Sequence, residues 1–410
     1  MRRLAAVALL TVTVVTSACS TPRWSGEPAL RDVAQSEQTR LLERVTAYED
    51  SALTEYLGRL GQRLSRRFPP IPYIADSRLV ETPGGEAAPS EAGTARHHDL
   101  SIHVLRDPTL AVFALPTGVL IVHTGLLAAV DNEAQLAAAL GHALAHDDER
   151  HALEAGQPEA VKPRLDGEAS TSRTAAAIFA LGLPLTARAA ITGYGRWREW
   201  AADAVAVSKM QWAGWDPREA PAMFNRLADW SREAGSREIF AFGDQRWLAA
   251  RAKWTRWLLR PMFEQPQTAF GIRNSKEFER LLRPVVRDNA YEDIRQGRFT
   301  LARRQLDRAA AATPEDPRVH LYYGELYRLQ AQRASAPAER DVELVEARAA
   351  YERALALDPA LAEAHRALGL LYYAMHDLAR ARGELERYLA LAPSAPDGPR
   401  IAEYVQELAR

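Results

Sequence analysis

The spacing of apolar residues predicts a mostly helical first part of the chain. Between residues 31 and 67, apolar side chains recur at intervals of three and four, as on one face of an amphipathic helix. Residues 132–151 and 196–210 show the same period. Residues 174–190 are nearly uncharged, which predicts a buried helix or a helical pair broken near Pro184.

A small sheet is predicted between these helices. Residues 100–105 and 111–122 alternate and are rich in Val, Ile, Leu and Phe, a pattern that favours strands. Pro116-Thr117-Gly118 supplies a tight turn inside the second segment. We therefore expect one strand followed by a hairpin.

The last third of the chain has a repeating pattern. Pro314, Pro359 and Pro393 each follow a helical segment with an alanine twelve residues earlier, and the last two prolines lie 34 residues apart, the tetratricopeptide period. The signatures Tyr323-Gly324-x-x-Tyr327 and Leu368-Gly369-x-x-Tyr372 agree with this register. The first spacing is longer, and residues 330–341 supply the insertion it requires. A plain helical bundle is the alternative.

The N-terminus has the pattern of a secretory signal. Arg2 and Arg3 precede an apolar stretch that is short for a bilayer span, and small residues lead to Cys19, the only cysteine. We predict that residues 1–18 are removed and that Cys19 is lipidated, as in bacterial lipoproteins; a plain signal peptide is the alternative. The mature chain is then expected in the periplasm, anchored by lipid alone, at the outer membrane of a Gram-negative bacterium.

Length and charge narrow the remaining choices. A chain of 410 residues predicts two or more domains. A net charge of −1 gives no indication of a nucleic-acid partner.

Two histidines give the first sign of chemistry. His142 and His146 lie four positions apart in a helical segment, so both imidazoles project from one helix face and can chelate one divalent ion. Alone, this pair is a weak signal, because the same spacing occurs by chance on many helices.

The surrounding motifs strengthen the signal. They are Phe113-Ala114-Leu115-Pro116-x-Gly118, Asn132-Glu133-Ala134-x-Leu136-Ala137, the histidines His142, His146 and His151, Glu199-Trp200-Ala201-Ala202-Asp203, and Ala213-Gly214-Trp215-Asp216-Pro217. In these motifs the chain resembles the gluzincin zinc metallopeptidases of the HtpX and CAAX prenyl protease family. It is most similar to the periplasmic, tetratricopeptide-bearing, BepA-like lipoprotein branch.

The resemblance implies a fold and a site. The fold would be α+β and mostly helical, with a zincin-like metallopeptidase domain over residues 19–285, containing a small sheet, and an all-α tetratricopeptide domain over residues 286–410. His142, His146 and Glu199 would bind one zinc ion, an arrangement that leaves a fourth position open. Asp203 would orient a histidine.

The resemblance also implies partners. The strand containing Phe113, Ala114 and Leu115 would bind an extended polypeptide substrate or client through its edge. The stacked repeats would bind a protein partner.

The sequence departs from the family at its most important position. The family has a glutamate after the first histidine, which transfers protons during hydrolysis; here Ala143 occupies this position. Asp147 shares the helix face but lies a full turn further along. Gln265-Pro266 and Arg273 are the nearest candidates for the family's His-Pro element and the arginine that follows it, and Ala111 replaces a usual asparagine.

Three functions fit these observations. The chain is predicted to be a catalytically impaired metallopeptidase-like protein that binds envelope proteins or takes part in their quality control. An active zinc metalloendopeptidase that degrades misfolded envelope proteins is the second hypothesis, and a non-enzymatic repeat scaffold is the third.

Overall fold

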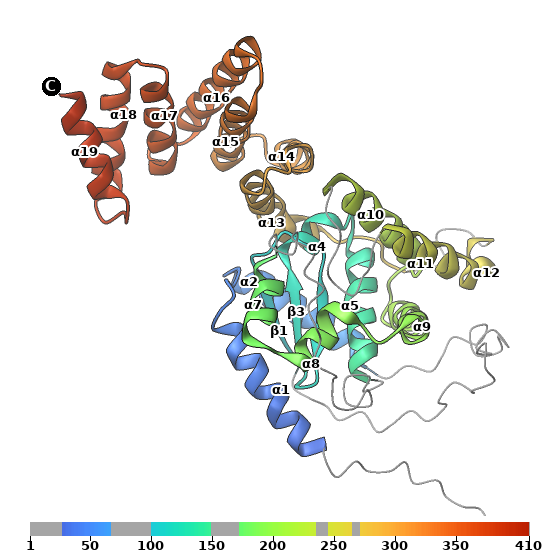
Figure 1. The fold of residues 1–410 in the computed structure, drawn as a ribbon. Coiled ribbons are helices and arrows are strands. Elements are labelled where there is room, and N and C mark those ends of the chain that lie inside the picture. Colours follow the sequence, from blue (N-terminus) through green and yellow to red (C-terminus); the bar gives the residue numbers. More distant parts are fainter. Residues whose placement is uncertain (1–26, 67–99, 149–171, 235–244, 265–270, 410) are drawn as a thin grey trace, which may run out of the picture.

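The computed structural model describes residues 27–66, 100–148, 172–234, 245–264 and 271–409 (Figure 1). Several sequence predictions lie outside these residues: the signal segment with Cys19, His151, and Gln265-Pro266. No helix in the described part of the chain combines the length and the apolar character needed to cross a bilayer.

The first part of the chain is a helical domain with a small sheet. Its elements are α1 (Glu27–Leu42), α2 (Ser51–Leu64), β1 (Ser101–Leu105), β2 (Val112–Leu115), β3 (Val119–His123), α4 (Thr124–Ala129), α5 (Glu133–Asp148), α7 (Arg173–Leu181), α8 (Pro184–Ala187), the π-helix η3 (Arg188–Thr192), α9 (Arg196–Trp212), α10 (Glu219–Ala234), α11 (Gln245–Leu258) and α12 (Arg260–Phe263). The amphipathic pattern before residue 67 thus forms two helices, and Pro184 separates α7 from α8 as expected.

The sheet has the order β1-β3-β2. β1 pairs with β3 in parallel, and β2 pairs with β3 antiparallel through the turn predicted at Pro116-Thr117-Gly118. Gly118 has φ 82°, a left-handed conformation that glycine adopts without strain. Strand β2 therefore lies at one edge of the sheet, beside helix α5.

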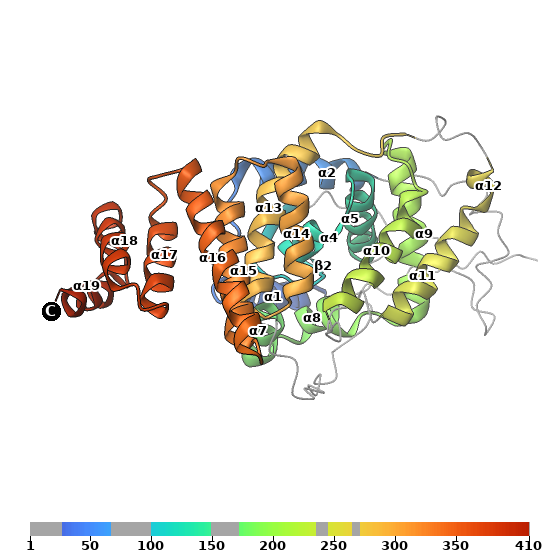
Figure 2. The same ribbon diagram turned by 90° about the horizontal axis from the view of Figure 1, so that it is seen from above.

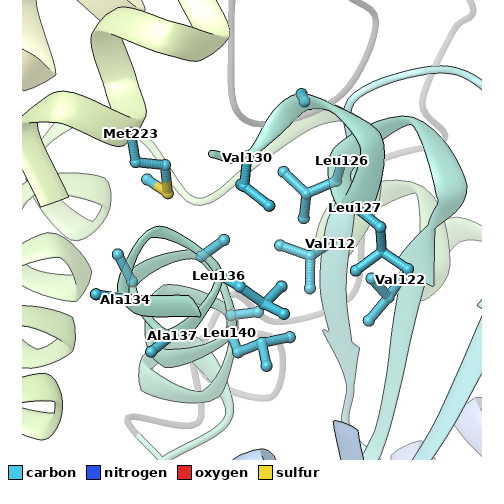
Figure 3. Packing of buried hydrophobic residues seen from close by; sticks show 14 of the residues in the cluster. Val112, Val122, Leu126, Leu127, Val130, Ala134, Leu136, Ala137, Leu140 and Met223 are labelled. Carbon is cyan, nitrogen blue, oxygen red and sulfur yellow. The ribbon is translucent and has the colours of Figure 1, made fainter. Parts of the chain in front are cut away.

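Helix α5 lies at the centre of the domain. Every side chain from Glu133 to His146 is buried. Figure 3 shows Leu136 and Leu140 of α5 facing Val112 of β2, with Met223 of α10 closing the cluster on another side. A helix buried on all faces must satisfy its polar side chains internally, and α5 carries two histidines in this position.

The last third of the chain consists of paired antiparallel helices. They are α13 (Lys276–Arg295), α14 (Phe299–Ala312), α15 (Pro317–Arg333), α16 (Pro337–Leu357), α17 (Ala362–Ala374), α18 (Leu378–Leu391) and the final α19 (Gly398–Leu408). The predicted repeat positions are buried in each second helix, as in Ala347, Tyr351 and Ala354 of α16. The predicted insertion lies at the junction of α15 and α16. The mostly helical fold, with a three-stranded sheet before the helical repeats, is confirmed.

Close packing explains the glycine signature of the repeats. A Cβ atom at Gly324 of α15 would lie 2.3 Å from the Tyr351 ring of α16. Tyr351 is fully buried, and its hydroxyl donates to Glu325 Oε1 at 2.7 Å. The missing side chain at residue 324 therefore makes room for the ring that fills the space between the helices.

Helix α13 joins the two parts. Its residues up to Val286 pack in the core of the first domain, whereas Ala290 and Ile294 pack in the core of the repeats. Thr124 of α4 donates to Asn289 of α13 at 2.9 Å. The predicted division between residues 285 and 286 stays a prediction, and it falls inside this continuous helix.

Candidate metal centre

The candidate metal ligands come from two helices that pack closely. His142 and His146 lie one turn apart on α5, and Glu199 lies in the first turn of α9. The two helices are in close contact at Gly141, where a Cβ atom would lie 3.4 Å from the Cα atom of Ala206, an ordinary van der Waals distance. The structure therefore brings together three residues that the sequence analysis singled out, 57 positions apart at the widest.

The start of α9 is fixed locally. Gly195 has φ 91°, which favours glycine, and directly precedes the helix. The Tyr194 backbone N–H donates to Glu199 Oε1 at 3.2 Å. This contact leaves the other carboxylate oxygen of Glu199 directed at the histidines.

Three ligand atoms converge on one point. Glu199 Oε2 lies 3.2 Å from His142 Nε2 and 3.4 Å from His146 Nε2, and the two nitrogens are 3.3 Å apart. A tetrahedral ion with bonds of 2.0–2.1 Å holds its ligand atoms about 3.3 Å apart. Glu199 Oε2 is also buried and accepts no well-formed hydrogen bond within the described residues. The donor set and its spacing therefore fit a zinc ion.

A buried carboxylate and a buried arginine contact the Nδ1 side of His142, the side away from its ligand atom Nε2. Asp203, one turn after Glu199, lies 2.9 Å from His142 Nδ1. Arg251 of α11 donates to both oxygens of Asp203, at 2.5 and 2.9 Å, and its Nη2 lies 3.0 Å from His142 Nδ1. A proton on Nδ1, shared with Asp203, leaves the Nε2 lone pair available to a metal ion bound between Nε2 and Glu199.

The charges of the cluster are strongly coupled. Burial and Arg251 lower the pKa of His142, but contacts with Asp203 and Glu199 outweigh them and hold this pKa above its ordinary value. Burial lowers the pKa of His146. Burial would raise the pKa of Glu199, yet the two imidazoles hold it well below its usual range. Glu199 is therefore ionised at neutral pH, the form in which a carboxylate binds metal.

A small cavity adjoins the three ligand atoms. Its volume is about 10 Å³, close to the space of one water molecule, and its lining includes His142, Ala143, His146, Tyr194 and Glu199. Ala143 is buried and presents only a methyl group there. Asp147 does not line this cavity; burial and the adjacent Asp148 raise the pKa of Asp147 to about 7.

The predicted substrate-edge strand borders the same cavity. Phe113 and Ala114 of β2 line it, and Leu115 completes the strand. All four residues of β2 are buried, and η3 packs against the strand. An extended polypeptide that paired with β2 would have to be accommodated beside η3, and the role of this edge stays a prediction.

Other sequence predictions lie elsewhere. Among the described residues, the side chain of Arg273 contacts Glu219 and forms no hydrogen bond with His142 or His146. Ala111 is buried in the hydrophobic core. The arginine that reaches the cluster is Arg251, which the sequence analysis missed. Its signal was available: Arg251 lies on the buried face of α11 with Leu248 and Thr255, where an arginine needs a buried partner.

Comparison with known proteins gives matches to two family models. Residues 78–249 match the model of peptidase family M48, and residues 343–375 match that of the TPR repeat. The first match contains both histidines, Glu199, Asp203 and Ala143.

Several relatives are similar to part of the chain. The beta-barrel assembly-enhancing proteases of Yersinia pestis and Escherichia coli K12 are 24% and 23% identical over 194 residues, which are 45% of this chain and 34% of each relative. The mitochondrial metalloendopeptidase OMA1 of Arabidopsis thaliana is 27% identical over 38% of this chain and 31% of its own length. The chain thus spans about a third of the length of these relatives.

Among solved structures, the similarity is loose. A thermophilic TPR protein from Thermus thermophilus is 20% identical with a TM-score of 0.28, covering 44% of this chain and 79% of that chain.

Proposed function

Because the chain carries a peptidase family M48 domain followed by tetratricopeptide repeats, we propose that it is a zinc-binding envelope protein that binds client polypeptides with impaired hydrolysis. In this proposal residues 19–285 form the zinc domain and residues 286–410 recruit a protein partner. Quality control of envelope proteins is the process that this combination serves.

One observation carries the proposal. Ala143 lines the cavity beside His142, His146 and Glu199, at the position where the resemblance places a proton-transferring glutamate. A methyl group neither accepts nor donates a proton. Loss of a positioned general acid–base lowers a rate by about a hundred- to ten-thousand-fold.

The ligand set argues that metal binding is retained. His142, His146 and Glu199 would hold the zinc ion, and Asp203 would fix the orientation of His142. Zinc in such a site polarises a carbonyl and lowers the pKa of a bound water. The protein residues would bind and orient the polypeptide without supplying the proton transfer.

The clients and the location follow from the relatives and the N-terminus. Two relatives are named for assisting the assembly of β-barrel proteins. A chain lipidated at Cys19 would meet such proteins in the periplasm. We therefore infer that the clients are unfolded or incompletely assembled envelope polypeptides, held along the edge of β2 beside η3.

The decisive experiment compares the native chain with Ala143→Glu. Both are purified, their zinc content is measured, and each is incubated with an unfolded β-barrel protein. We expect about one zinc per chain in both. Cleavage should be at least about a hundredfold faster in Ala143→Glu than in the native chain, and a chelator should abolish it.

The variant His146→Ala, made in both backgrounds, is the control. Cleavage by the native chain that disappears in His146→Ala would establish the active-peptidase alternative instead. Absence of zinc from both proteins would favour the non-enzymatic scaffold.

A further inference from the structure

Helices α11 and α12 present a surface of cations around an exposed indole, here called the Trp–Arg face. It consists of the exposed side chains of Arg246, Lys253, Arg256, Trp257 and Arg260. Trp257 is 44% exposed, an unusual state for the largest apolar side chain. No aspartate or glutamate occurs between residues 245 and 263.

The four cations of this face have no carboxylate partners among the described residues. None of them forms an ion pair there. Some exposed arginines of the repeats differ, because Arg380 pairs with Asp377 and Arg382 pairs with Glu386. In a chain with a net charge of −1, the face gathers four positive charges that form no ion pair with the described residues.

The face is held rigidly from below. Trp200 of α9 stacks with both Trp247 and Trp254 of α11, each with ring centroids 5.9 Å away. Arg251, on the opposite side of α11, is fully buried against Asp203. The helix is therefore packed in place, and the orientation of the face requires no folding on binding.

The position of the face fits a flat partner. Figures 1 and 2 show α11 and α12 at the end of the molecule opposite the last repeat helix, α19. A helix of 14 residues such as α11 is about 21 Å long, so its cations are spread over several headgroup diameters. The cations of the face therefore lie on an outer end of the molecule.

We propose that the Trp–Arg face docks on the anionic phospholipid headgroups of a membrane. Basic side chains near such a surface gain electrostatic attraction, and an indole prefers the boundary between headgroups and acyl chains. The combination of four cations with one exposed indole satisfies both requirements on the surface formed by α11 and the start of α12. This contact adds to the lipid anchor predicted at Cys19 and is independent of whether the zinc domain hydrolyses peptides.

Vesicle binding by residues 20–410, without the predicted signal and lipidation site, tests the proposal. Vesicles of phosphatidylethanolamine with phosphatidylglycerol are compared with vesicles of phosphatidylcholine by co-sedimentation. We expect binding to the first and not to the second, decreasing as salt is raised. The double variant Lys253→Glu with Arg256→Glu should bind about tenfold or more weakly.

A second variant tests the contribution of the Trp257 indole to vesicle binding. Binding should shift the tryptophan emission of the native chain to shorter wavelength, and Trp257→Ser should reduce both the shift and the affinity. Arg382→Glu with Arg387→Glu makes the same charge change on exposed positions of α18, and Leu391→Ser removes an exposed apolar side chain there. These controls should bind vesicles like the native chain.

Three results would overturn the proposal. The first is equal binding of the chain to both kinds of vesicle. The second is a loss of vesicle binding in Arg382→Glu with Arg387→Glu as large as that in Lys253→Glu with Arg256→Glu. The third is vesicle binding that added polyglutamate abolishes and that Trp257→Ser leaves unchanged. The last result would identify an acidic polypeptide as the partner of the face. Far-UV circular dichroism of each variant verifies that the fold is intact.

Discussion

The metal cluster and the repeats are held together by contacts of very different range along the chain. Arg251 reaches His142 across 109 positions and Asp203 across 48. In the repeats, Tyr351 bonds to Glu325 across 26 positions and Tyr372 to Glu352 across 20. The cluster requires most of the first domain to be folded, whereas each repeat needs only its neighbours.

The two regions also differ in how they handle charge. Arg251 and Asp203 are completely or almost completely buried, so removing either one leaves the other charge in the protein interior without its main partner. Ion pairs of the repeats, such as Arg366 with Asp397, are partly exposed to water. Substituting one partner of an ion pair should therefore lower the free energy of unfolding strongly at this buried pair and only slightly in the repeats.

The largest expected effect follows from removing one buried charge. Arg251→Met should lower the free energy of unfolding by about 3–5 kcal/mol, because Asp203 then stays buried with only His142 beside it. Arg366→Met is the matched variant in the repeats and should cost at most about 1 kcal/mol. Urea denaturation measures both. Equal losses would contradict the difference drawn between the two regions.

Zinc should stabilise only the region that contains the cluster. At zinc concentrations about 1,000 times the dissociation constant, the first domain should gain about 4 kcal/mol, and a chelator should remove this gain. All nine tryptophans precede residue 258, so tryptophan fluorescence reports the first domain, while far-UV circular dichroism reports both. His146→Ala should abolish the zinc effect. A zinc-induced gain that persists in this variant would place the metal elsewhere.

Close glycine contacts give a matched pair of smaller perturbations. A Cβ atom at Gly125 of α4 would lie 2.4 Å from the backbone of Pro108, and one at Gly324 would lie 2.3 Å from the Tyr351 ring. Each Gly→Ala change should destabilise its own region by about 1–3 kcal/mol through overpacking. We expect Gly125→Ala to lower the midpoint of the unfolding transition followed by tryptophan fluorescence. Gly324→Ala should lower the midpoint followed by circular dichroism more than the midpoint followed by fluorescence.

Two other helical glycines serve as controls for this pair. A Cβ atom added at Gly58 of α2 or at Gly383 of α18 would have no neighbouring atom within 4 Å. Alanine there should be neutral or stabilise by up to about 1 kcal/mol, since it favours the helix. Destabilisation by either control would mean that backbone effects, not packing, account for the losses.

The smallest effect tests a single hydrogen bond of the repeats. Tyr351→Phe removes the hydroxyl that donates to Glu325, which retains its contact with Arg328 at 2.6 Å. The loss should be about 0.5–1.5 kcal/mol, visible in thermal unfolding followed by dichroism. A loss as large as that of Arg251→Met would show that this bond belongs to a more extensive network.

The same difference in range explains what the sequence revealed. The repeats could be predicted because Ala347, Tyr351 and Ala354 pack on helices next to them in sequence, so that pattern and structure coincide. His142 and His146 were evident because one helix carries both. The approach of Glu199 was inferred only through resemblance to a family, since no local pattern relates α9 to α5.

Two features of the site escaped sequence reasoning for physical reasons. Arg251 was missed because its role depends on Asp203, a partner on another helix, and Arg273 was chosen instead for its place in the chain. The packing of η3 against β2 was not predicted either, because alternation in a strand shows which faces are buried but not which element packs against them. Both features are set by tertiary packing.

Helix α13 fixes the distance between the metal cluster of the first domain and the tetratricopeptide repeats. It is 20 residues long, about 30 Å, and its two halves are buried in different cores, so the repeats cannot swing on a loose linker. A polypeptide bound to the repeats would reach the zinc domain at a set separation along its own chain. The molecule would then select the client segment at the metal cluster by its distance along the client chain from the segment bound to the repeats.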